Sequence, residues 1–177
     1  MEIKLEDLKV LFSEEQLQTR IKELADEMNK FYNGEEVIAI CVLKGAVLFA
    51  VDLVKHLNMP LQMEFIRLSS YGSSTTTSGK VNAVDIKLPD LNDKNVLIIE
   101  DIVDTGLTAK FLIDFMNCNF HTKSIKFCSL LDKKNTRKVD IEPDYYGFDV
   151  DDKFVVGYGL DYDGYYRNLR YIGYKEN

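Results

Sequence analysis

The stretch that decides the fold runs from Val96 to Thr108 and reads Val-Leu-Ile-Ile-Glu-Asp-Ile-Val-Asp-Thr-Gly-Leu-Thr. Its four leading apolar residues are typical of a central strand in a parallel sheet, which is buried on both faces. Two adjacent carboxylates, Glu100 and Asp101, follow this strand, and a third acid, Asp104, precedes a turn that opens a predicted helix. Ligands of open α/β proteins bind at the carboxyl ends of parallel strands. The stretch therefore predicts a fold class and a binding site together.

The rest of the chain alternates between strand-like and helical patterns. Ser13 and Gln16 form a capping-box pattern, after which apolar residues recur at helical spacing as far as Asn33. Further helices are expected from Gly45 to Pro60 and over 106–116, and strands over 37–43, 62–68, 81–88, 96–99, 124–131 and 154–156. This alternation predicts an α/β fold with a mostly parallel, doubly wound sheet flanked by helices.

Residues 69–80 interrupt the alternation, because they are polar and rich in serine, threonine and glycine. Such a segment buries little surface, and we expect it to be a mobile loop. It lies between two strand-like runs inside a chain of 177 residues, which is about the length of one domain. We therefore expect a single domain over residues 1–177, in which loop 69–80 is a functional lid rather than a linker.

The composition argues against several classes of partner. A formal net charge of −7, from 29 acidic and 22 basic residues, does not suit a nucleic-acid or anionic-membrane surface. No apolar run approaches the roughly 20 residues of a membrane span. Cys41, Cys118 and Cys128 are odd in number and widely spaced, so we expect reduced core cysteines in a cytoplasmic protein.

Each part of the central stretch has a chemical use. The turn from Thr105 to Thr108 offers backbone N–H groups and hydroxyls at a helix N-terminus, which is a natural phosphate cradle. Glu100 and Asp101 are hard oxygen ligands for a cation or acceptors for sugar hydroxyls, and Asp104 could take a proton. Acids that only cap a helix and face water are the alternative for Asp101 or Asp104 taken singly, but the combined spacing is far more specific.

Other phosphate-binding patterns fit less well. Six residues separate Gly72 from Gly79 and Val81 follows Lys80, whereas a P-loop has four residues between its glycines and Ser or Thr after the lysine. No G-x-G-x-x-G pattern follows a strand, so a dinucleotide-binding fold is not expected. A receiver-type phosphoacceptor domain also uses strand-end acids and a lysine, but it leaves the threonine turn and the polar loop without a role.

The central stretch resembles the phosphoribosyl-pyrophosphate (PRPP) binding signature of type I phosphoribosyltransferases, and more narrowly that of the hypoxanthine (6-oxopurine) phosphoribosyltransferases. The resemblance covers about residues 37–172. Val42-Leu43-Lys44-Gly45-Ala46 resembles the family's pyrophosphate loop, in which the peptide before the lysine can be cis. Residues 67–72 resemble the start of its flexible catalytic loop, with Ser70 and Tyr71 at the positions of its Ser-Tyr pair.

Two later segments resemble the purine site of the same family. Residues 130–134 read Leu-Leu-Asp-Lys-Lys and resemble the segment in which a lysine of the family binds the exocyclic oxygen of the purine. The resemblance implies that Lys133 has this role. In residues 153–162 the resemblance implies that Phe154 stacks on the base, that Val155 contacts it through its backbone, and that Asp161 serves the purine site and a second magnesium ion. Arg167 is implied to face the pyrophosphate.

The resemblance implies a purine salvage enzyme, a glycosyltransferase that moves the 5-phosphoribosyl group of PRPP to N9 of hypoxanthine or guanine. The products are IMP or GMP and pyrophosphate. The implied cofactor is Mg²⁺, held by Glu100, Asp101 and Asp161, and the implied catalytic residues are Asp104 as general base, Ser70 and Tyr71. The implied PRPP-binding residues are Lys44, Gly45, Glu100, Asp101, Asp104, Thr105, Gly106, Leu107, Thr108 and Arg167.

The resemblance also implies a division of the chain. The core is expected over about 35–140, and a small hood over the active site is expected from about 145–177 together with the N-terminal segment. We further expect a homodimer or homotetramer. Two alternatives stay open: a regulator that binds PRPP or a nucleotide and attaches to nucleic acid, and an enzyme for another base such as uracil or adenine. The net charge and the presence of the family's site residues argue against the first, these residues being Asp104, Lys133, Phe154 and Asp161. Lys133 and the Phe-Val-Val strand over 154–156 argue against the second.

Overall fold

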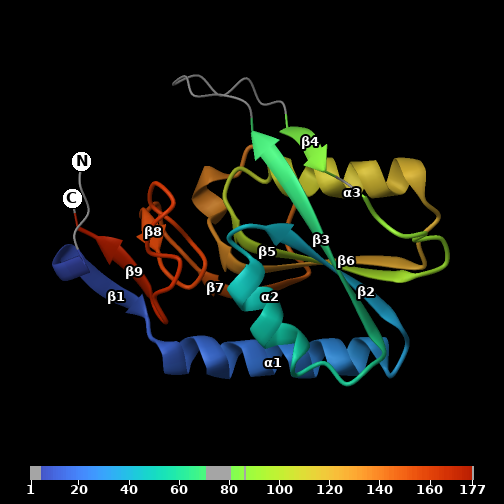
Figure 1. Ribbon diagram of the computed structural model, residues 1–177, viewed down its shortest axis with the longest axis horizontal. Helices are drawn as coiled ribbons and strands as arrows, with labels where there is room; N and C mark the ends of the chain where they lie inside the picture. The colour runs from blue at the N-terminus through green and yellow to red at the C-terminus, as the bar shows by residue number, and fades with distance from the viewer. Residues whose placement is uncertain (1–4, 71–80, 86, 177) are drawn as a thin grey trace.

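A six-stranded sheet forms the centre of the fold (Figure 1), with its strands in the order β4-β3-β2-β5-β6-β7. The computed structural model describes residues 5–70, 81–85 and 87–176. The strands are β2 (Val37–Leu43), β3 (Leu61–Ser70), β4 (Val81–Asp85), β5 (Asn95–Val103), β6 (Ser124–Asp132) and β7 (Tyr145–Asp149). Every neighbouring pair is parallel except β3 and β4, so the predicted mostly parallel sheet is confirmed.

Helices cover both faces of this sheet. α1 (Glu14–Tyr32) and α2 (Val47–Val54) lie on one face, and α3 (Leu107–Asn119) lies on the other (Figure 1). In β2, Ala39 and Cys41 pack in one core cluster with residues of α1 and α2, whereas Ile38 and Ile40 pack in a second cluster with residues of α3. Successive side chains of a strand point to opposite faces, so the unbroken apolar run of β2 is buried on both. The doubly wound arrangement is confirmed.

The ends of the first two helices follow local rules. The capping box of α1 is present, because Ser13 and Gln16 exchange side-chain and backbone hydrogen bonds, and Asn33 ends the helix in the left-handed conformation. The second helix is shorter than the expected span from Gly45 to Pro60. After α2 ends at Val54, the N–H groups of His56 and Leu57 bond to carbonyls three residues back, which tightens the chain into turns.

The central strand is longer than predicted. The sequence indicated a strand over 96–99, but β5 continues to Val103 because it keeps pairing with β6: Glu100 lies opposite Ser129 and Val103 opposite Asp132. The strand expected over 81–88 ends at Asp85, and β8 (Val155–Val156) leaves Phe154 outside the strand. As a result, Glu100 and Asp101 belong to the last part of strand β5 rather than to a loop after it.

A second, antiparallel sheet joins the two ends of the chain. Its order is β1 (Leu8–Phe12), β9 (Ile172–Lys175), β8, and it lies beside the β7 side of the molecule (Figure 1). The sequence did not indicate β1 or β9. Residues 145–149, which we expected in the hood, form β7 of the large sheet instead. Two short 3-10 helices, η1 (Leu5–Asp7) and η2 (Lys134–Thr136), complete the described elements.

Cys41 and Cys128 are buried core residues as expected, but Cys118 is exposed on α3, so its predicted core position is wrong. Cys118 lies on the solvent side of the helix, between the exposed residues Asn117 and Asn119. Among the residues that the structure describes, no helix combines the length and apolar character that a membrane crossing requires.

Candidate active site

The paired acids lie at the carboxyl end of β5. Glu100 is buried at 6 % exposure, and Asp101 is partly exposed. Burial, with a smaller contribution from the charge of Asp101, raises the pKa of the Glu100 carboxyl well above its ordinary value. Burial also raises the pKa of Asp101, against the opposing effects of the Ile102 N–H and the charge of Arg167. Burial thus destabilises the ionised form of both carboxyls. A bound cation or hydrogen bonds from hydroxyl groups would stabilise that form.

The loop between β2 and α2 lies directly against these acids. A methyl group in place of the Gly45 hydrogen would overlap the Oδ2 atom of Asp101, so a larger residue there would displace the Asp101 carboxylate. The Leu43–Lys44 peptide is cis, as the family resemblance allows. Lys44 is exposed next to this contact. The predicted pyrophosphate loop and the predicted metal-side acids are therefore adjacent.

A C-terminal segment covers the same loop. A methyl group on Gly159 would overlap the carbonyl oxygen of Gly45, and the φ of Gly159 is +100°. Arg167 donates from Nη1 to the Gly159 carbonyl at 2.6 Å and pairs through Nη2 with Oδ1 of Asp161 at 2.6 Å. The structure thus brings two predicted site residues, Arg167 and Asp161, together beside the Gly159 backbone that contacts Gly45.

The turn after β5 opens α3 without a side-chain cap. Gly106 is the left-handed N-cap residue with φ +79°, and Leu107 begins the helix. The first four N–H groups of a helix have no intrahelical acceptor. Within the described residues, the Leu107 N–H makes only a long contact of 3.4 Å with the Thr105 hydroxyl. Asp104 is exposed and Thr108 is partly exposed. This turn fits the predicted phosphate cradle, because its donors are free to meet an anion.

The segment after β6 braces this turn. The N–H of Lys133 donates to the Val103 carbonyl at 2.9 Å, and the N–H of Lys138 donates to the Thr105 carbonyl at 2.9 Å. Arg137 donates from Nε to the Asp104 carbonyl at 3.2 Å and also pairs with the buried carboxylate of Asp132. Neither Arg137 nor Asp132 was assigned a role from the sequence, because a pair five residues apart is no recognised motif and the other partner of Arg137, the Asp104 carbonyl, lies 33 residues away.

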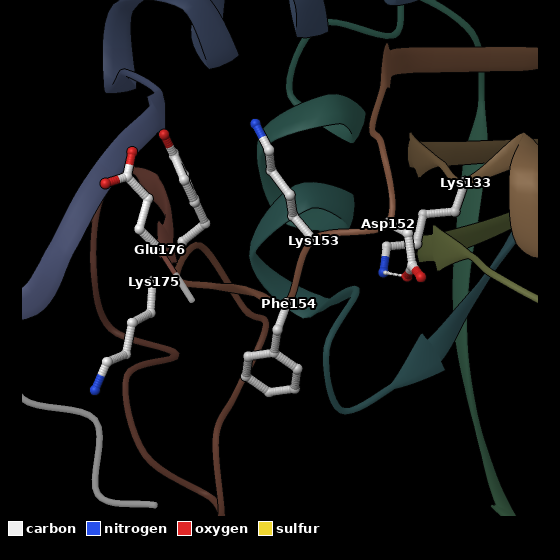
Figure 2. Close-up of a pocket in the computed structure, with 7 residues that line it drawn as sticks. Lys133, Asp152, Lys153, Phe154, Lys175 and Glu176 are labelled. Carbon is white, nitrogen blue, oxygen red and sulfur yellow. Dashed lines mark ion pairs between the residues drawn. The ribbon is translucent and has the colours of Figure 1, made fainter.

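Two of the predicted purine-binding residues share a cavity of about 380 Å³ (Figure 2). It is lined by Lys133, Asp152, Lys153, Phe154, Tyr174, Lys175 and Glu176. The Lys133 ammonium lies 3.6 Å from Oδ1 of Asp152, a residue that the sequence did not single out. Phe154 is 55 % exposed and points away from the Lys153 side chain (Figure 2), while Val155 is buried in β8. A cavity lined by an exposed ring and a buried lysine suits a flat base with a carbonyl group.

Not every predicted site residue can be placed. Ser70 is the last residue of β3, and Tyr71 and residues 71–80 of the predicted lid lie outside the described residues. Asp161 is engaged with Arg167 and accepts the Gly164 N–H at 2.7 Å. In the part of the chain that the structure describes, no three acidic, histidine or cysteine side chains gather closely enough to hold a metal ion unaided.

Comparisons with known proteins agree with this geometry. The phosphoribosyl transferase domain model matches residues 10–163. The hypoxanthine-guanine phosphoribosyltransferase of Bacillus subtilis strain 168 is 48 % identical over 165 residues, which are 93 % of this chain and 91 % of the relative. The corresponding enzyme of Mycobacterium avium is 44 % identical over 170 residues, 93 % of this chain and 83 % of the relative.

Solved structures give the same result. The hypoxanthine phosphoribosyltransferase of Staphylococcus aureus has a TM-score of 0.91 and 41 % identity, covering 97 % of this chain and 93 % of that one. A hypoxanthine-guanine phosphoribosyltransferase of Bacillus anthracis has a TM-score of 0.90 and 44 % identity, covering 99 % and 100 %. Matches of this length and identity place the chain in the phosphoribosyl transferase family, among the hypoxanthine-guanine phosphoribosyltransferases.

Proposed function

We propose that the protein transfers the 5-phosphoribosyl group from PRPP to N9 of hypoxanthine or guanine, giving IMP or GMP and pyrophosphate. One observation carries the proposal: the end of β5 adjoins a glycine loop on one side and an uncapped helix start on the other. The cavity lined by Lys133 and Phe154 adjoins the end of β6, because Lys133 is the residue that directly follows this strand. β6 is the neighbour of β5 in the sheet. Sugar, phosphate and base sites therefore share one edge of the sheet.

The phosphate groups meet backbone and cationic donors. The turn from Thr105 to Thr108 binds the 5′-phosphate through its free N–H groups. Lys44 and Arg167 face the pyrophosphate, and Glu100 and Asp101 accept hydrogen bonds from the ribose hydroxyls. This distribution explains how a chain with a net charge of −7 can bind a polyphosphate, because the anionic substrate meets amides and cations rather than the acidic surface.

The base is held and activated by different side chains. Asp104 accepts a hydrogen bond or proton from the five-membered ring of the purine, as general base. Lys133 favours a 6-oxo over a 6-amino purine, because an ammonium group donates hydrogen bonds and accepts none. Phe154 offers its exposed ring for stacking. Ser70 and Tyr71 complete the proposal as loop residues that exclude water from PRPP.

The carboxyls at the end of β5 fit a magnesium ion shared with substrate. Mg²⁺ is usually bound by one or two carboxylates together with substrate phosphates and waters, rather than by a cage made only of protein groups. Glu100 and Asp101 supply such a pair, and burial, together with the charge of Asp101, raises the pKa of Glu100. Asp161 would hold a second ion. When bound, Mg²⁺ would neutralise the charge that develops on the departing pyrophosphate.

Removal of magnesium tests this proposal. We expect that EDTA abolishes nucleotide formation from PRPP and hypoxanthine and that added Mg²⁺ restores it. Because protons compete with the metal for Glu100 and Asp101, whose pKa values are raised, the apparent affinity for Mg²⁺ should fall as the pH is lowered. Initial rates at graded Mg²⁺ and two pH values measure both effects. Full activity in EDTA would contradict the assignment.

Replacement of Lys133 by Ala tests the base site. A hydrogen bond to a charged group contributes about 1.5–3 kcal/mol, so the KM for hypoxanthine and for guanine should rise by about 10-fold or more. Lys153→Ala is the matched control, because Lys153 lines the same cavity but its ammonium lies over the Tyr174 ring at 4.5 Å. Unchanged KM values for both bases in Lys133→Ala would remove Lys133 from the site.

The proposal also includes a cytoplasmic location and assembly into a homodimer or homotetramer. Support for assembly comes from exposed apolar side chains on α2 and β3, namely Leu48, Val51 and Phe65. Light scattering on the purified protein measures the mass of the assembly directly.

A further inference from the structure

A half-buried carboxylate on α2 collects donors from three parts of the chain. Oδ2 of Asp52 accepts a hydrogen bond from the Tyr158 hydroxyl at 2.6 Å and another from Nε2 of Gln18 at 3.0 Å. Oδ1 of Asp52 accepts from the Lys55 ammonium at 2.8 Å. Gln18 belongs to α1 and Tyr158 to the C-terminal segment. No part of the proposed reaction uses this group, although it lies on the helix that directly follows Lys44 and Gly45.

The bond between Asp52 and Tyr158 is charge-assisted. Burial alone would raise the pKa of Asp52, but the hydrogen bonds from Lys55, Tyr158 and Gln18 outweigh it and hold the pKa below its ordinary value. Burial and the bond to Asp52 raise the pKa of Tyr158. The carboxylate is therefore ionised and the phenol protonated around neutral pH, and such bonds are about twice as strong as neutral ones.

Tyr158 leads directly to the pyrophosphate loop. It lies between two glycines with a φ of +48°, and its N–H donates to the Leu169 carbonyl at 2.9 Å. The next residue, Gly159, packs against the carbonyl of Gly45, and its own carbonyl accepts a hydrogen bond from Arg167. A shift of Tyr158 would therefore move the backbone that covers Gly45 and holds Arg167 in place.

Asp52 leads to the same loop from the other side. It lies on α2, which begins at Val47, immediately after the Lys44–Ala46 loop. The N–H of Ala50 donates to the carbonyl of Ala46 at 2.8 Å, so the loop continues into the helix without a break in hydrogen bonding. The hydrogen bond from Tyr158 to Asp52 thus joins the element that carries the loop to the segment that covers it.

We propose that Asp52 and Tyr158 are positioning residues that hold the 157–160 segment on the Lys44–Gly45 loop and so set the affinity for the pyrophosphate group of PRPP. The inference rests on the proposed function for the identity of that ligand. Neither side chain touches the substrate. Both act through Gly159, Gly45 and Arg167, so their removal weakens pyrophosphate binding while the purine site around Lys133 stays intact.

The test is Tyr158→Phe, which removes one hydroxyl and keeps the ring. We expect the dissociation constant for magnesium pyrophosphate, measured by calorimetry on the full chain, to rise by about 10-fold, as for the loss of one charge-assisted bond. The KM for PRPP should rise by a similar factor. The KM for hypoxanthine and kcat should stay within about two-fold, a split that a general loss of stability does not produce.

Four further variants separate positioning from structure. Lys55→Met removes a partner of the same carboxylate without touching the link to Tyr158, so pyrophosphate affinity should stay unchanged. Asn29→Ala removes the bonds that join α1 to the turn after α2, at His56 and Asn58, and serves as a stability control. Asp52→Asn keeps an acceptor for the Tyr158 hydroxyl and should weaken affinity less than Asp52→Leu.

Two results would overturn the positioning role of Asp52 and Tyr158. Wild-type affinity for magnesium pyrophosphate in Tyr158→Phe would overturn the positioning role. Equal weakening in Asn29→Ala at a matched loss of melting temperature would also overturn it, since the effect would then follow stability alone. A wild-type protein that forms no nucleotide would refute the proposed function, while the pyrophosphate titrations would still decide the role of Asp52 and Tyr158.

Discussion

Replacement of Asp104 by Asn is expected to lower the turnover number for nucleotide formation by about 100-fold or more, as removal of a general base does. Asparagine matches the shape of aspartate but cannot take the purine proton. The fold should tolerate the change, because the side chain is exposed and the main chain is held separately, through the Arg137 bond to the Asp104 carbonyl. Steady-state rates with saturating PRPP and hypoxanthine measure the effect.

Asp114→Asn is the matched control for this experiment. Asp114 is an exposed aspartate on the adjacent helix α3, where it pairs with Lys110 at 2.8 Å. Exposed pairs of this kind contribute little to stability, and Asp114 has no place in the proposed chemistry. Its variant should keep wild-type turnover. If Asp104→Asn stayed within a few-fold of the wild type, the general-base assignment would be wrong.

Replacement of Gly159 by Ala is expected to reduce kcat/KM for PRPP by about 100-fold. The added methyl group would overlap the Gly45 carbonyl, so either the pyrophosphate loop or its cover must shift. A displacement of about 1 Å in a positioned site can cost about 100-fold in rate. The KM for PRPP and the rate at low PRPP concentration are the measurements, and the KM for hypoxanthine should change much less.

Gly164→Ala controls for backbone strain. Gly164 also has a positive φ, at +84°, but a methyl group there would meet nothing within 4 Å. Both variants therefore carry the cost of an L residue in a left-handed conformation, and only Gly159→Ala presses on Gly45. Equal effects of the two substitutions on the KM for PRPP would show that contact with Gly45 does not matter.

The fold was predictable where local patterns and tertiary packing agree. The apolar run of β2 appears in the sequence and in the structure with the same bounds, 37–43, because it is buried on both faces and short of polar interruptions. The capping box of α1 fixes its start in the same way. β1 and β9 were not predicted, since their short, mixed sequences form strands through pairing with distant segments, β1 with β9 and β9 also with β8.

The candidate site was likewise predictable where its residues are contiguous in sequence, and not where folding brings distant residues together. The acids of β5 and the turn after it are contiguous in sequence, so their chemistry can be inferred before their geometry is known. Asp152 and Lys133 meet only through the folded chain. Asp52 and Tyr158 are 106 residues apart. No spacing rule links such pairs, because their proximity follows from how the sheet and the C-terminal segment pack.

The central claim is that the site at the carboxyl end of β5 catalyses the transfer of phosphoribose to a 6-oxopurine. The most direct test is a spectrophotometric assay of the protein with PRPP and Mg²⁺ and, in turn, hypoxanthine, guanine, xanthine, adenine and uracil. Nucleotide should form with hypoxanthine or guanine. None should form with adenine, because Lys133 only donates hydrogen bonds and a 6-amino group cannot accept one. None should form with uracil, because it lacks the five-membered ring on which Asp104 is proposed to act. The absence of product with every 6-oxopurine would contradict the account.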